Sequence, residues 1–318
     1  MMWVQRGLAL LFLLSIGLPA NAQDYPSKPI RVLLPFAGGT DVVARLLAAK
    51  MSPAIGQQLV TEPRLGAGGN IAHETLAKAA PDGYTLLMAA PPVVINPHLN
   101  KVNFDPLRDF TPVALLTAIP NVLVVHPSVK AKSMQELVQL ARSAPGKLTY
   151  ASGGVGSSNH LAGELLKSVT ATDIVHVPYK SGTIALTGAL GGEVDIVIVA
   201  ASSVVGIVRD GRMRALAVLD TKRLTAMPDV PTSAEAGLPQ VVMVNWYMLL
   251  APAGTPRSIV EKLNAAAVKA MTAADARERL SAIGGDASLG TPEQAAELLR
   301  REYEQWGRVI REAGIKAE

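Results

Sequence analysis

Short apolar runs that alternate with helical patterns constrain the fold of this chain more than any other feature. Six runs rich in Val, Ile and Leu cover residues 30–34, 85–88, 122–125, 174–177, 194–199 and 215–218. Most of their positions are apolar, without strict alternation, which is typical of strands that helices cover on both faces. These runs therefore predict buried strands of a largely parallel sheet.

Helical periodicity lies between and after these runs. The predicted helices cover residues 41–51, 133–143, 159–169, 256–271 and 292–313. The last begins with Thr291, Pro292 and Glu293, a capping hydroxyl followed by proline and an acid in the first turn. Alternating strands and helices predict an α/β fold.

Composition limits the classes of protein that this chain can belong to. Its 318 residues are enough for two domains, and 49% hydrophobic residues can form a large core. The net charge of +4 is scattered, without a run of five basic residues, which argues against nucleic-acid binding. The absence of cysteine excludes disulfides, thiolate metal sites and a cysteine nucleophile.

The N-terminal segment has the pattern of a secretory signal. Arg6 precedes an apolar run over 8–18, and Ala20-Asn21-Ala22 has the small residues of a cleavage site. A membrane-spanning helix needs about 20 apolar residues, more than this run contains. We interpret residues 1–22 as a signal peptide of an exported protein, with an anchoring N-terminal helix as the alternative. A lipoprotein anchor is excluded because no cysteine follows the cleavage site.

Glycine clusters mark three places where a predicted strand is followed by a helix. They lie at 36–41, 66–70 and 151–158. In open α/β sheets, ligands bind beyond the carboxyl ends of strands, against helix N-termini. These N-termini carry unpaired N–H groups and about half a positive charge, and glycine allows a ligand to approach the backbone. The clusters indicate an anion-binding cleft that needs no arginine, or alternatively three ordinary tight turns.

Motifs for catalysis and cofactor binding are incomplete or absent. The sequence has no full G-x-G-x-x-G fingerprint, no phosphate-binding P-loop and no G-x-S-x-G elbow. Its five histidines lack metal-ligand spacing. We therefore expect no metal, no cofactor and no enzymatic activity. The alternative is an exported serine hydrolase that uses Ser157 or Ser158 with His160. Trp246 and Tyr247 are either core residues or one wall of a ligand site.

Further segments, modest one by one, occur in a specific order along nearly the whole chain. They cover 25–31, 35–41, 66–70, 80–86, 104–110, 150–154, 160–164, 176–180, 227–232, 235–239 and 250–256. Together they resemble the periplasmic solute-binding receptors of tripartite tricarboxylate transporters, the Bug receptors. The resemblance implies a two-lobed periplasmic binding protein of the Venus-flytrap type, each lobe a mostly parallel sheet flanked by helices. Lobe one would comprise 24–124 plus 245–318, and lobe two 125–244.

The resemblance also implies a ligand and the residues that hold it. Family members bind a small organic carboxylate in the cleft, mainly through backbone amides and small hydroxyl groups. The positions carried over to this chain are Ala37, Gly38, Gly39, Thr40, Asp41, Gly154, Val155, Gly156, Ser157 and Ser158, and the predicted site also includes Tyr179 and Ala200. Tyr179 and Lys180 either face the cleft or are a buried tyrosine and a solvated lysine. Thr40 or Asp41 would also cap the helix that follows. We expect a periplasmic monomer that delivers the carboxylate to integral membrane transporter subunits. A ligand-sensing receptor for a signalling partner is a second alternative.

Departures from the family pattern concern the ligand. The first glycine-rich loop is about two residues shorter than usual in the family. Segments 89–94 and 199–202 are largely apolar where the family often has polar residues. Because an unpaired polar group costs about 1–3 kcal/mol, we expect the distal pocket to suit an aliphatic or aromatic carboxylate.

Overall fold

The computed structural model describes residues 25–312 and 314–316, so the predicted signal peptide at 1–22 lies outside the described residues. The strands are β1 (Ile30–Leu34), β2 (Leu59–Pro63), β3 (Thr85–Ala89), β4 (Phe110–Val125), β5 (Thr149–Ser152), β6 (Val175–Pro178), β7 (Ile196–Ala200), β8 (Arg214–Val218), β9 (Val244–Pro252) and β10 (Asp286–Ala287). The helices are α1 (Gly39–Ile55), the short 3-10 turn η1 (Ala67–Gly69), α2 (Asn70–Ala77), α3 (Pro92–Leu99), α4 (Met134–Ser143), α5 (Ser158–Thr170), α6 (Gly182–Leu190), α7 (Ala201–Arg209), α8 (Arg257–Thr272), α9 (Ala274–Ala282) and α10 (Pro292–Glu312).

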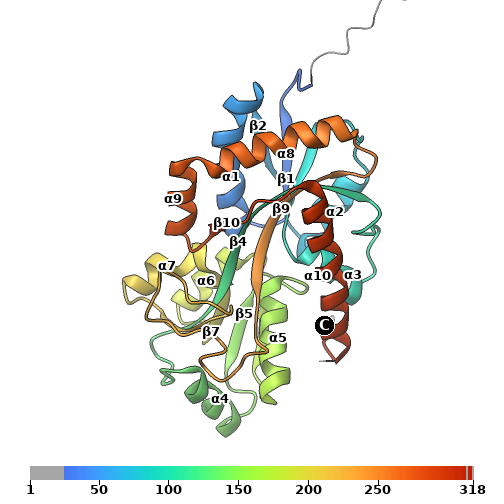
Figure 1. Ribbon diagram of the computed structural model, residues 1–318. Helices are drawn as coiled ribbons and strands as arrows, with labels where there is room; N and C mark the ends of the chain where they lie inside the picture. Colours follow the sequence, from blue (N-terminus) through green and yellow to red (C-terminus); the bar gives the residue numbers. More distant parts are fainter. Residues whose placement is uncertain (1–24, 313, 317–318) are drawn as a thin grey trace, which may run out of the picture.

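The strands form one mixed sheet in the order β2-β1-β3-β9-β4-β7-β5-β6, with β8 and β10 also paired to β4. One group is parallel around β1, which pairs with β2 and β3, and the other is parallel around β5, which pairs with β6 and β7. Antiparallel β4 and β9 run side by side between the two groups (Figure 1). The predicted α/β fold, parallel strand groups flanked by helices, is confirmed.

Strand β4 connects the two groups. Its first half pairs with β9, and its second half pairs with β7 and β8. The sequence predicted only residues 122–125 of this strand. Its earlier part contains Pro112 and Pro120, and proline is unusual in a central strand. The register with β9 shifts between Pro112 and Ala114, so the strand continues past this proline with a bulge. The predicted lobe boundaries fall at the end of β4 and the start of β9.

Local signals account for several helix starts, with one correction. The Ser133 hydroxyl accepts a hydrogen bond from the backbone N–H of Glu136, and Thr291 caps α10 in the same way. Helix α1 differs, because its N-cap is Gly38 and no side chain caps it. Thr40 and Asp41 lie inside the first turn, so the prediction that one of them caps this helix is wrong.

The core consists of two apolar clusters, one on each face of the sheet. Neighbouring residues of a strand join different clusters, as the alternation of side chains requires: Val32 and Val197 belong to one, and Leu33 and Ile198 to the other. Each cluster therefore contains residues of both strand groups, and the core is continuous between them. None of the helices in the described part of the chain is long and apolar enough to cross a membrane.

Candidate functional site

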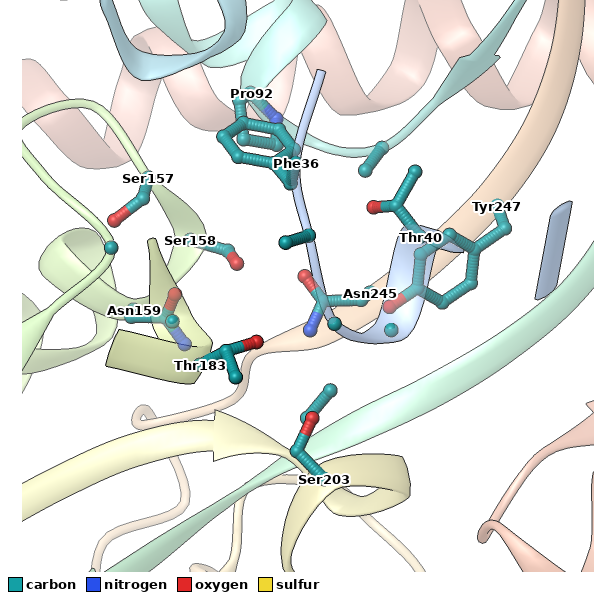
Figure 2. Close-up of a pocket in the computed structure, with 17 residues that line it drawn as sticks. Phe36, Thr40, Pro92, Ser157, Ser158, Asn159, Thr183, Ser203, Asn245 and Tyr247 are labelled. Carbon is teal, nitrogen blue, oxygen red and sulfur yellow. The ribbon is translucent and has the colours of Figure 1, made fainter. Parts of the chain in front are cut away.

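Five helices begin around one cavity, called here the central cavity. Figure 2 shows the side chains that surround it, which come from both strand groups. The lining residues are Phe36, Ala37, Gly38, Gly39, Thr40, Ala90, Pro92, Gly153, Ser157, Ser158, Asn159, Gly182, Thr183, Ala200, Ser203, Asn245 and Tyr247. Its volume is about 50 Å³. A buried water needs about 10–15 Å³, so the cavity has the size of a few waters or of a short acid.

The electrostatics of the central cavity come from the backbone. Within the described residues, its lining contains no Asp, Glu, Lys, Arg or His side chain. The N-termini of α1, α3, α5, α6 and α7 all reach it, and each carries about half a positive charge. No side chain caps α1 or α7, so backbone N–H groups of their first turns remain available to a ligand. This arrangement favours an anion.

Hydroxyl groups without a partner complete the lining. The hydroxyls of Thr40, Ser158, Thr183, Ser203 and Tyr247 form no hydrogen bond with any of the described residues. Thr40, Ser158 and Tyr247 are only 3%, 8% and 2% exposed. These hydroxyls face the cavity, and a hydrogen bond from one of them to a charged ligand would contribute about 1.5–3 kcal/mol.

Strand β9 places Tyr247 and Asn245 at one side of the cavity. Burial raises the pKa of Tyr247, so the phenol stays protonated and can donate a hydrogen bond. The phenol fits because residue 39 is glycine: a Cβ there would lie 2.2 Å from the Tyr247 Oη. Asn245 Nδ2 donates to Asn121 Oδ1 at 2.6 Å, which fixes this amide between the crossing strands β4 and β9.

The structure separates the predicted ligand-binding residues into two sets. Ala37, Gly38, Gly39, Thr40, Ser157, Ser158 and Ala200 line the central cavity. Gly154, Val155 and Tyr179 line a second cavity instead. Asp41 does not line the central cavity, and its carboxylate accepts hydrogen bonds from Arg45 Nε at 2.8 and 2.9 Å. Gly156 packs against Asn96, whose Oδ1 would lie 2.3 Å from a Cβ at this glycine.

Most of the polar lining outside the glycine-rich loops was not predicted from the sequence. Asn159, Thr183, Ser203 and Asn245 were not predicted, and Tyr247 was left open between core and wall. Thr183 follows the N-cap of α6, Ser181, whose hydroxyl accepts from the N–H of Ile184 at 3.3 Å. This cap was the one local signal for a helix start there, and Ser203 and Asn245 had none.

The hydroxyl of Ser157 takes part in a helix cap. It donates to the carbonyl of Gly154 at 2.6 Å and accepts from the backbone N–H of His160 at 3.3 Å. The His160 ring accepts at Nδ1 from the N–H of Gly156 and packs 4.6 Å from the ring of His176. These contacts stabilise the loop and the start of α5, and they give no support to a serine nucleophile.

Comparisons with known proteins agree over nearly the whole chain. The family described as Tripartite tricarboxylate transporter family receptor matches residues 43–315. The UPF0065 protein in the tcbD-tcbE intergenic region of Pseudomonas sp. (strain P51) is 38% identical, over 99% of this chain and 95% of that protein. Protein BugT of Bordetella pertussis is 36% identical, over 95% and 94%.

Solved structures of similar proteins share the fold. A periplasmic transporter superposes with a TM-score of 0.90 at 39% identity, over 92% of this chain and 100% of that one. R. palustris Rpa4515 with adipate gives 0.88 at 34% identity, over 92% and 99%. MatC (Rpa3494) from Rhodopseudomonas palustris with bound malate gives 0.85 at 35%, over 90% and 100%. The predicted resemblance is confirmed, and the chain belongs to the tripartite tricarboxylate transporter receptor family, whose members include the Bug proteins.

Proposed function

We propose that this protein is a periplasmic receptor that binds a small organic carboxylate in the central cavity and delivers it to integral membrane transporter subunits. The convergence of five helix N-termini on a cavity without charged side chains carries this proposal. Adipate and malate, the ligands of two related structures, are both carboxylates. A signal peptide at residues 1–22 would direct the chain to the periplasm.

Binding in this site relies on hydrogen bonds to a desolvated carboxylate. The hydroxyls of Thr40, Ser158 and Tyr247, with N–H groups at the starts of α1 and α7, are the proposed donors. A micromolar Kd corresponds to about 8 kcal/mol, and each hydrogen bond to a charged group contributes about 1.5–3 kcal/mol. Several such bonds together with apolar contacts reach this value after ordering costs. Closure of the cleft follows if the closed form binds the ligand more tightly than the open form.

The apolar part of the lining bears on the rest of the ligand. Phe36, Ala90, Pro92 and Ala200 offer no hydrogen-bonding side chain to it. We propose that they contact an aliphatic or aromatic group attached to the carboxylate. A ligand with a further polar group at this position would lose the hydrogen bonds that water gives it, at a cost of about 1–3 kcal/mol.

Calorimetric titration with a panel of aliphatic, aromatic and tricarboxylic acids tests the proposal. We expect at least one aliphatic or aromatic acid to bind, and Gly39→Val to abolish binding because its side chain would collide with Tyr247. Gly206→Val is the matched control, since a Cβ there would have no atom within 4 Å among the described residues beyond its chain neighbours and the backbone of its own helix. Failure of every acid to bind, or unchanged affinity in the Gly39 variant, would contradict the assignment.

Delivery to a transporter needs its own measurement. We expect the ligand-loaded protein, a monomer by light scattering, to retain transporter subunits in a pull-down from membranes. Recovery of a signalling protein instead would favour the sensing alternative. An esterase activity lost in Ser157→Ala would favour the hydrolase alternative.

A further inference from the structure

The two strand groups touch at two places beside the central cavity. At the first, α7 lies against α1, and a Cβ at Gly39 would lie 3.2 Å from the Ser202 Oγ. At the second, α3 lies against the loop before α5, and a Cβ at Gly156 would lie 2.3 Å from the Asn96 Oδ1. Helices α1 and α3 follow strands of the β1 group, whereas α7 and this loop follow strands of the β5 group. The structure therefore shows the two groups closed on each other at both contacts.

The two oxygen atoms at these contacts are shielded from water without a hydrogen bond in return. Ser202 Oγ and Asn96 Oδ1 are both buried, and neither has a hydrogen-bond partner among the residues that the structure describes. The Gly156 N–H is not available to Asn96, because it donates to His160 Nδ1 at 3.3 Å. Neither Ser202 nor Asn96 lines the central cavity or the second one, so a ligand in these cavities does not contact the two oxygens.

The other hydrogen bonds of Asn96 lie within its own strand group. Its Nδ2 donates to the carbonyl of Gly68 at 2.7 Å and to Asn70 Oδ1 at 2.8 Å. Both amide hydrogens are thus used, and the two bonds fix Oδ1 in its direction toward the β5 group. These two bonds do not depend on the contact between the groups, whereas the burial of Oδ1 does.

Burial of the two oxygens disfavours the closed arrangement. When the strand groups separate, water can bond to both oxygens, and when the groups meet, this water is lost and no donor or acceptor replaces it. Such a cost acts on the closed form alone, so it shifts the equilibrium toward the open form. A ligand that bonds to Thr40 of α1 and Ser158 of α5 joins the two groups and offsets the cost.

We propose that Ser202 and Asn96 oppose closure of the empty cleft, so that closure depends on bound ligand. This inference rests on the proposed function, in which the cleft closes over a carboxylate. Each unpaired oxygen should lower the ratio of closed to open molecules by roughly 5- to 150-fold. The apparent affinity falls with the population of the form that binds tightly. The protein thus loses affinity, and its empty and loaded forms differ in shape, which allows a membrane subunit to distinguish them.

Ser202→Ala tests the proposal, because it removes one of the two oxygens and breaks no hydrogen bond between described residues. Ser168→Ala is the matched control, since Ser168 is an exposed residue near the end of α5. The chain has no cysteine, so Gln58→Cys/Gln139→Cys places one dye at an exposed position on each side of the cleft. Single-molecule FRET then gives the closed fraction of the ligand-free protein, and calorimetry with the acid panel gives the affinity.

Asn96→Ala is the second variant. It removes the other oxygen together with the bonds to Gly68 and Asn70, which the open and closed forms share. It should therefore raise the closed fraction and also lower the free energy of unfolding measured with urea. An unchanged closed fraction in Asn96→Ala would exclude Asn96 from the proposed role.

We expect ligand-free wild type and Ser168→Ala to be mostly open. Ser202→Ala should raise the ratio of closed to open molecules by about fivefold or more and tighten acid binding by the same factor. A mostly closed ligand-free wild type, or an unchanged ratio in Ser202→Ala, refutes the proposal and leaves the proposed function standing. Weaker acid binding in Ser202→Ala also refutes it, because the hydroxyl then holds the ligand. If no acid binds, the proposed function falls, and the ligand-free closed fraction alone decides the role of Ser202.

Discussion

Replacing Tyr247 by phenylalanine separates ligand binding from folding. The Tyr247 hydroxyl lines the central cavity, the residue is 2% exposed, and the hydroxyl has no hydrogen-bond partner among the described residues. The substitution removes one oxygen and keeps the ring that packs in the core. It therefore removes a donor whose partner, on our proposal, is the ligand.

The substitution should weaken ligand binding and leave the stability of the ligand-free protein unchanged. A hydrogen bond to a carboxylate contributes about 1.5–3 kcal/mol, and 1.4 kcal/mol is about tenfold in Kd, so Tyr247→Phe should weaken binding roughly 10- to 150-fold. The free energy of unfolding of the ligand-free protein should not fall. The hydroxyl faces the cavity and has no partner among the described residues, so the substitution removes no hydrogen bond within them, and the ligand-free variant is expected to be about as stable as wild type.

Calorimetry gives the affinity, and urea unfolding without ligand gives the stability. Tyr25→Phe is the control, because the Tyr25 hydroxyl donates to the carbonyl of Gly83 at 2.7 Å and lies outside the cavity. The control should lose about 0.5–1.5 kcal/mol of stability and keep its affinity. The reasoning is refuted if Tyr247→Phe binds as tightly as wild type, or if it behaves like the control.

Three further predictions concern stability. Burial lowers the pKa of His73 to about 3, whereas an unfolded histidine titrates near 6.5, so its contribution to stability is present above about pH 6.5 and is lost as the pH falls. Between pH 7 and pH 5, the free energy of unfolding measured with urea should decrease by about 2 kcal/mol less in His73→Phe than in wild type. Ser157→Ala removes the cap of α5 and should lower the free energy of unfolding by about 1 kcal/mol in the same assay. Glu302→Ala removes the carboxylate that accepts from the buried indoles of Trp246 and Trp306, at 3.0 and 3.3 Å. The substitution should lower the free energy of unfolding by about 2 kcal/mol or more and change the tryptophan fluorescence emission.

The secondary structure was predictable where periodicity and end signals agreed. Residues 30–34 form β1 as expected, and α4 begins at Met134, one residue after the predicted boundary, with Ser133 as its N-cap. The first half of β4 was not predictable, because its pairing with β9 depends on residues more than 120 positions away and overrides Pro112. Strand β2 ends in a charged residue and a proline, so it lacks the apolar run that marked the other strands.

Apart from Ala200, the lining of the candidate site was predictable only where glycine-rich loops form it. The loop at 36–41 and Ser157-Ser158 lie at the central cavity, whereas Asp41 turns away because α1 begins two residues before the predicted start. Thr183 and Ser203 reach the cavity because the sheet order brings the starts of α6 and α7 to it. Such an arrangement depends on tertiary structure and has no local pattern in the sequence.

The glycines also have a role that neither sequence interpretation considered. A Cβ at Gly68 would lie 2.7 Å from the carbonyl oxygen of Val155, and one at Gly156 would lie 2.3 Å from Asn96. Both contacts join the region of α2 and α3 to the loop before α5, and so to the other strand group. A side chain at either position would keep these elements apart without entering the central cavity. These two glycines therefore allow the strand groups to approach each other closely. On the proposed function, this close approach would help to exclude water from the bound carboxylate.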